Sequence, residues 1–69
     1  MDEQVFRETF SEIVSAIKEA GYDPYEQLVG YLKTKQEYYI TRTRNARTLI
    51  KTLEPERLQQ YVSELQTKR

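Results

Sequence analysis

The chain has 69 residues, with 11 basic and 11 acidic side chains and no histidine, cysteine or tryptophan. This length allows one small domain, and the composition excludes disulfide bonds, zinc sites built from cysteine or histidine, and catalysis that needs an imidazole base. No apolar stretch is long enough to span a membrane, and the lack of cysteine fits a cytoplasmic protein. We therefore expect no enzymatic activity, no cofactor, no metal and no small-molecule substrate.

The zero net charge hides an asymmetry between the two halves. Residues 1–32 carry seven acidic and two basic side chains, whereas residues 33–69 carry nine basic and four acidic ones. Two interpretations remain open. The halves neutralise each other, within one chain or between two, or the basic stretch faces a partner.

The first predicted helix spans about residues 3–20. Its apolar residues recur at steps of three and four: Phe6, Phe10, Ile13, Val14, Ile17 and Ala20. Gly21 follows where a left-handed residue commonly ends a helix. Asp23 as N-cap and Pro24 at the first helical position predict a second helix to about Lys33. Gly30 inside that helix predicts a close helix–helix crossing, where no side chain would fit.

We predict a short helical turn and not a strand for residues 34–41, because the sequence contains no second strand with which this segment could pair. A helix then resumes at about Thr41 and ends before Pro55. Its buried face is expected to carry Ala46, Leu49, Ile50 and Leu53. A last helix, started by Pro55, runs to about Thr67. The sequence thus predicts one all-α domain over residues 1–69, a compact bundle of four helices plus a short helical turn.

Six tyrosines in so short a chain are unusual. We expect Tyr22, Tyr31 and Tyr61 to fill a small core with their hydroxyl groups at its rim. A chain of this length without a disulfide or metal has little core, so we also expect a symmetric homodimer. The candidate dimer-interface residues are Tyr31, Tyr38, Tyr39 and Ile40, because tyrosine is favoured at interfaces.

The candidate partner-binding residues are Arg42, Arg47 and Lys51. If residues 42–51 are helical, these bases form a cationic edge beside the buried face. The alternative is that they neutralise acidic side chains of the first helix, Glu8, Glu12 or Glu19, within the dimer. Nucleic acid is not an expected partner, because the isoelectric point is about 6.3 and the first helix is acidic.

Three stretches carry a family resemblance: GYDPYEQLVGYL at residues 21–32, YI at 39–40 and NARTLI at 45–50. In this order and spacing, over about residues 13–65, they resemble the IreB family of small cytosolic regulators of low-GC Gram-positive bacteria. The basic residues Arg42, Arg47 and Lys51 match basic positions of the family. Residues 33–36 depart from it, since Lys33-Thr34-Lys35-Gln36 replaces a spacer similar to S-G-D-P.

The resemblance implies an all-α homodimer with a non-enzymatic role downstream of a transmembrane PASTA-type Ser/Thr kinase. It also implies control of peptidoglycan synthesis and of resistance to cell-wall antibiotics, in part through Clp-dependent turnover of the enzyme that commits UDP-N-acetylglucosamine to the wall. The phosphorylated threonine of the family lies in an N-terminal arm that, counted back from Gly21, precedes Met1. Thr9 falls inside the first predicted helix instead, so we expect no phosphorylation of the family type in this chain. The alternative functions are a structural self-dimerising module and a helical nucleic-acid-binding domain.

Overall fold

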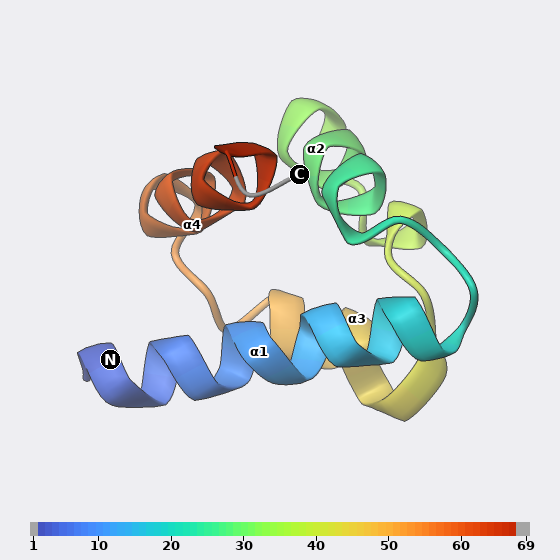
Figure 1. Cartoon of the computed structure of the whole chain (residues 1–69), viewed down its shortest axis with the longest axis horizontal. Coiled ribbons are helices and arrows are strands. Elements are labelled where there is room, and N and C mark those ends of the chain that lie inside the picture. Colours follow the sequence, from blue (N-terminus) through green and yellow to red (C-terminus); the bar gives the residue numbers. More distant parts are fainter. Residues whose placement is uncertain (1, 68–69) are drawn as a thin grey trace.

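A computed structural model describes residues 2–67 of the chain. Their regular elements are helices, in the order α1 (Glu3–Glu19), α2 (Pro24–Thr34), the 3₁₀ turns η1 (Glu37–Tyr39) and η2 (Thr43–Asn45), α3 (Ala46–Ile50) and α4 (Pro55–Thr67). Figure 1 shows two layers: α1 runs along the bottom with α3 packed against it, and α2 and α4 lie side by side above. The all-α prediction with four α-helices is confirmed.

The boundaries of α1 and α2 follow from the capping residues that the sequence predicts. Gly21 has φ +90°, and the backbone N–H groups of Gly21 and Tyr22 donate to the carbonyl groups of Lys18 and Ile17. This pair of bonds is a Schellman motif, which satisfies the last carbonyl groups of α1. At the start of α2, Asp23 Oδ1 accepts a hydrogen bond from the Tyr25 N–H at 3.0 Å.

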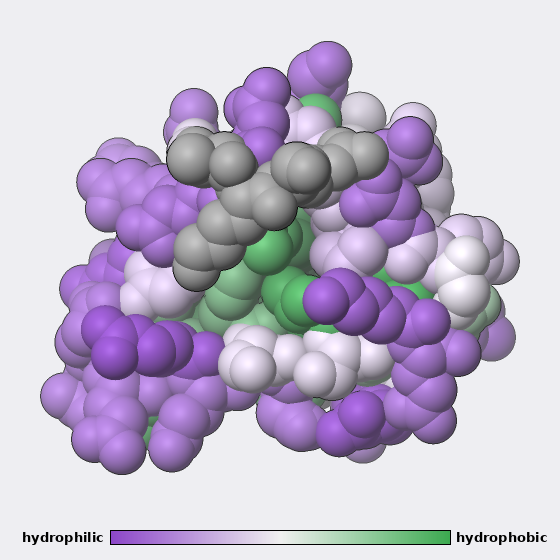
Figure 2. Space-filling view, viewed as in Figure 1, coloured by the Kyte–Doolittle hydropathy of each residue, from purple (hydrophilic) through white to green (hydrophobic). Residues whose placement is uncertain are grey.

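The core lies between the two layers and takes apolar residues from every α-helix. The buried residues are Phe6, Phe10, Ile13, Ala16 and Ile17 of α1, Leu28 of α2, Ala46 and Ile50 of α3, Leu58 and Val62 of α4, and Ile40 and Leu53 from the connections. The face in Figure 2 shows the edge of this core as a hydrophobic hollow surrounded by hydrophilic side chains. The buried faces predicted for the first and third helices are confirmed in the main, although Ala16 is buried in place of the expected Ala20, and Val14 and Leu49 are only partly buried.

The expected tyrosine core is only partly right. Tyr61 packs between Phe6 and Phe10, with ring centroids 5.0 and 5.1 Å away, and Tyr31 is partly buried against the core. Tyr22 was expected there too, but it is 58% exposed. The reason is that Tyr22 lies in the connection after the left-handed Gly21 and not on a helix face that packs on the core.

The predicted continuous helix over residues 42–51 is wrong. Arg44 and Asn45 have φ of +53° and +61°, so the backbone breaks there and α3 begins only at Ala46. Left-handed backbone is costly for residues other than glycine, although asparagine tolerates it best. Contacts made by Arg44 offset part of this cost. Its Nη2 lies 2.6 Å from Glu12 Oε1, and its Nη1 lies 3.2 Å from Glu19 Oε2.

Candidate functional site

The most exposed aromatic surface lies on segment 36–41, the connection that contains η1. Tyr38 is 62% exposed and Tyr39 is 42% exposed. Their rings stack, with centroids 5.0 Å apart and an interplanar angle of 29°. Tyrosine presents much contact area with few rotatable bonds, so such a pair is well suited to bind another protein.

Two basic side chains around α3 hold segment 36–41 from one side. Arg47 Nε donates to the Ile40 carbonyl oxygen at 2.7 Å, and Arg47 Nη2 donates to the Tyr38 carbonyl oxygen at 3.3 Å. Lys51 Nζ lies 2.8 Å from Glu37 Oε2, at the start of η1. Hydrogen bonds from a charged donor are the stronger kind, so Arg47 is the main fastening on this side.

Helix α2 holds the same segment from the other side. Gln27 Oε1 accepts a hydrogen bond from the Thr41 N–H at 2.9 Å. Gly30 lies against the Tyr39 ring so closely that a Cβ atom at Gly30 would come within 2.8 Å of Tyr39 Cδ1. The predicted close approach at Gly30 is therefore present, but its partner is an aromatic ring and not a crossing helix. With both sides fastened, the exposed tyrosines lose little freedom on binding a partner.

The structure brings the two predicted sets of site residues to one place. Arg47 and Lys51, expected to bind a partner, contact the segment that carries Tyr38 and Tyr39, expected at the dimer interface. Arg42 is exposed and forms no ion pair within residues 2–67. Because the backbone breaks at residues 44 and 45, Arg42 lies outside α3, whereas Arg47 lies within it and Lys51 caps its end, so the expected cationic edge along one helix does not form.

Two residues of the predicted dimer interface take part in the chain's own packing. Ile40 is only 1% exposed and belongs to the core, so it offers no surface to a second chain. Tyr31 is partly buried against the same core. Tyr38 and Tyr39 are the residues of that set that remain exposed, because η1 turns them away from the layer interface while the Arg47 and Gln27 contacts keep Ile40 inward.

Part of the acidic charge of α1 is paired within the chain, but by a residue outside the predicted set. Arg44 pairs with Glu12 and Glu19, whereas Arg42, Arg47 and Lys51 do not contact them. All three partners are about half exposed, so these pairs contribute only about 0–1 kcal/mol each. Thr9 lies inside α1, as expected.

A second polar cluster ties the start of α1 to α4. The Tyr61 hydroxyl donates to Glu3 Oε2, and Arg57 Nη1 lies 3.9 Å from Glu3 Oε1. The Arg57 guanidinium also lies over the Phe6 ring, 5.2 Å from its centroid. The hydrogen bond to Glu3 and the partial burial of the ring raise the pKa of Tyr61 above its ordinary value of about 10.

Sequence reasoning gave no role to Gln27, Thr41 or Arg44. Gln27 lies in the stretch that carries the family resemblance, but a polar residue on a helix gives no sign of a bond 14 residues away. In residues 2–67 we find no cluster of acidic side chains arranged to hold a metal ion. Nor is any helix in this range both long and apolar enough to cross a bilayer.

These features define a small helical protein with an exposed pair of stacked tyrosines on segment 36–41. Residues 1–65 match the family model described as the IreB regulatory phosphoprotein, so the chain belongs to the IreB family. The resemblance is thus confirmed, and the match extends the predicted range of residues 13–65 to the first residue. A UPF0297 protein from Ruminiclostridium cellulolyticum is 38% identical over 56 residues, which is 81% of this chain and 64% of that relative's length.

Proposed function

We propose that this chain is a non-enzymatic regulator that works as a homodimer and binds other proteins through Tyr38, Tyr39 and the neighbouring Arg42. The observation that carries the proposal is the stacked, exposed tyrosine pair held by Arg47 and Gln27 on opposite sides. A segment that presents exposed aromatic rings and is fastened on both sides is expected of a binding surface, because the rings lose little freedom when a partner binds. In this proposal Arg47 and Lys51 position the surface, and Arg42 contacts the partner.

We further propose that the regulated process is peptidoglycan synthesis, downstream of a PASTA-type Ser/Thr kinase. The regulated step is the Clp-dependent turnover of the enzyme that commits UDP-N-acetylglucosamine to the cell wall. Membership of a family described as regulatory phosphoproteins supports a signalling role. The chain spans 64% of the relative's length, so the match covers part of a longer protein.

Complementation with matched tyrosine variants tests this proposal. A strain that lacks the gene would receive wild type, Tyr38→Ser, Arg42→Ala or the control Tyr22→Ser. Tyr22 suits as control because it is 58% exposed and lies outside segment 36–41. We expect cephalosporin resistance and the level of the committing enzyme to follow wild type for Tyr22→Ser and the deletion for Tyr38→Ser. Equal complementation by both tyrosine variants would reject the surface.

Sedimentation equilibrium separates the adaptor from a self-dimerising module. We expect wild type to be dimeric at tens of micromolar, and Arg42→Ala to remain dimeric while failing to complement. A monomeric wild-type chain would reject the homodimer. An Arg42→Ala variant that dimerises and complements fully would favour a module whose partner is a second copy of itself.

A further inference from the structure

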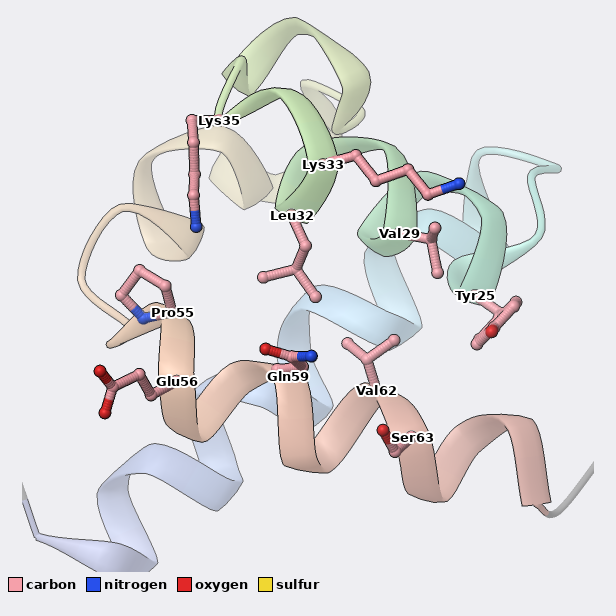
Figure 3. Close-up of a pocket in the computed structure, with 10 residues that line it drawn as sticks. All are labelled: Tyr25, Val29, Leu32, Lys33, Lys35, Pro55, Glu56, Gln59, Val62 and Ser63. Carbon is pink, nitrogen blue, oxygen red and sulfur yellow. The ribbon is translucent and has the colours of Figure 1, made fainter.

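A groove of about 350 Å³ runs between α2 and α4 (Figure 3), and its lining does not include Tyr38 or Tyr39. Its lining residues are Tyr25, Val29, Leu32, Lys33 and Lys35 from the α2 side and Pro55, Glu56, Gln59, Val62 and Ser63 from α4. In Figure 3, Val29 and Leu32 point from α2 toward α4, and Val62 points back at them. The floor of the groove is therefore apolar.

The groove is about as long as two turns of a helix. Its lining on α4 extends from Pro55 to Ser63, which corresponds to about 12 Å or two helical turns. Two roughly parallel helices that leave such a furrow accept a third helix, whose apolar residues at i, i+3 or i+4, and i+7 enter it. An occupant of this kind would cover Leu32 and Val29, which are only partly buried in the single chain.

Two lysines border the groove, and neither has an acidic partner among residues 2–67. Figure 3 shows Lys35 reaching toward Pro55 at one end, while Lys33 extends past Val29 toward the Tyr25 end. Neither lysine forms an ion pair within the described range 2–67. By contrast, the basic side chains of Arg7, Arg44, Lys51 and Arg57 each lie within 4 Å of a carboxylate. Glu56 is the acidic residue of the lining, so the groove carries an excess of one positive charge.

The backbone of Lys35 adds a second, independent observation. Lys35 ends α2 in the left-handed conformation, with φ +61°, and its N–H donates to the Tyr31 carbonyl oxygen at 2.6 Å. Glycine is the usual residue at this position, because a side chain there is strained. Strain of this kind is typical of functional positions, and here it places an ammonium group at the mouth of the groove.

We infer that the α2–α4 groove docks an acidic amphipathic helix of a partner protein. Its apolar residues would pack on Val29, Leu32 and Val62, and its carboxylates would pair with Lys33 and Lys35. This inference rests on the proposed function, that the chain acts by binding other proteins, and it adds a second surface to segment 36–41. A basic helix would meet the like charge of Lys33 at one end and the excess positive charge of the groove as a whole, which disfavours it.

The test uses a synthetic peptide of about 14 residues, with leucines at i, i+3, i+4 and i+7 and glutamates at the exposed positions. Its matched control carries lysine in place of every glutamate. Titration of the isotope-labelled chain by NMR locates binding, and fluorescence anisotropy measures affinity. We expect the acidic peptide to shift the resonances of Val29, Leu32 and Val62, and the basic peptide to bind much more weakly. Equal binding of both peptides, or no shifts in the groove at millimolar peptide, would overturn the inference.

Variants of the chain test the contribution of the lysine charges to binding separately from their effect on the stability of the fold. Lys33→Gln is expected to weaken the acidic peptide about two- to fivefold, whereas Lys18→Gln, which removes an exposed lysine of α1 outside the groove, leaves affinity unchanged. Lys35→Gly is the sharper variant, because it should raise the melting temperature and still weaken binding. If Lys35→Gly binds as wild type does, the lysine is no docking residue. Shifts confined to the groove between α1 and α4, lined by Phe10, Val14 and Leu65, would also contradict the assignment.

Failure of this inference and failure of the proposed function give different results. If the acidic peptide does not bind while Tyr38→Ser still fails to complement, the groove inference is rejected and the proposed function is not. If the peptide binds but Tyr38→Ser complements fully, the groove inference is supported and the tyrosine surface is rejected. If Lys33→Gln alters the sedimentation of the chain without peptide, the occupant is a second copy of this chain and the partner helix is rejected.

Discussion

Substitution of Gly30 tests whether the Tyr39 ring determines the residue at this position. Gly30 lies within α2 with helical backbone, where alanine is normally more stable by about 1 kcal/mol. In this chain a Cβ atom would lie 2.8 Å from Tyr39 Cδ1 and 3.2 Å from Tyr39 Cγ. Because Cγ is next to the backbone end of the side chain, the whole Tyr39 side chain must move to make room.

The two effects have opposite signs and similar sizes. Overpacking costs about 1–3 kcal/mol, which offsets the propensity gain of about 1 kcal/mol. We therefore expect Gly30→Ala to lower the free energy of unfolding by about 0–2 kcal/mol. In a Tyr39→Ala background the clash is absent, so the same substitution should raise the free energy of unfolding by about 1 kcal/mol. The coupling between the two positions is then about 1–3 kcal/mol.

Urea unfolding followed by circular dichroism measures all four proteins of this double-mutant cycle. Equal denaturant slopes would show that each variant unfolds from the same compact state. A Gly30→Ala substitution that stabilises both backgrounds by the same amount would refute the reasoning. The Tyr39 ring would then move aside at no cost, and the glycine would need another explanation.

Three further predictions concern single positions. Arg47→Ala should lower the free energy of unfolding by about 1.5–3 kcal/mol, because the Ile40 carbonyl loses its charged donor, while Arg42→Ala should change it by less than about 0.5 kcal/mol. Equal costs in urea unfolding would contradict the positioning role. Lys35→Gly should raise the free energy of unfolding by about 1 kcal/mol, because glycine relieves the left-handed strain; a lower melting temperature would disprove this. Since the pKa of Tyr61 is raised in the folded state, its stabilising contribution is complete below pH 10 or so and is lost as the pH rises through the folded pKa. Glu3→Gln should therefore lower the pKa of Tyr61, which the pH dependence of its ring NMR resonances measures; an unchanged pKa would contradict this prediction.

The helices themselves could be predicted because their signals are local. The apolar stripe of α1 and the glycine after it gave the end of that helix, and the Schellman bonds at Gly21 confirm it. Asp23 and Pro24 gave the start of α2 in the same way. Each of these signals depends on residues within one or two helical turns, so the printed sequence contains all of the information.

The break before α3 could not be predicted, because its signal is not local. Arg44 and Asn45 adopt left-handed backbone without glycine, and the apolar spacing from Ala46 onward continues as if the helix were uninterrupted. The contacts of Arg44 with Glu12 and Glu19 lie 32 and 25 residues away. These contacts offset part of the cost of the left-handed backbone, and nothing in the local helical pattern indicates them.

By itself the sequence determined the class of fold, the buried face of each helix and the family, because periodicity, capping residues and motif spacing are properties of neighbouring residues. Only the tertiary structure decided which residues pack against those faces. Gly30 lies against the Tyr39 ring. Arg47 was expected to contact a partner, but it donates hydrogen bonds to the carbonyl groups of Tyr38 and Ile40. Arg44 pairs with Glu12 on the acidic face of α1. The physical reason is that a helical period specifies a direction around an axis, whereas the partner found in that direction depends on how separate helices pack.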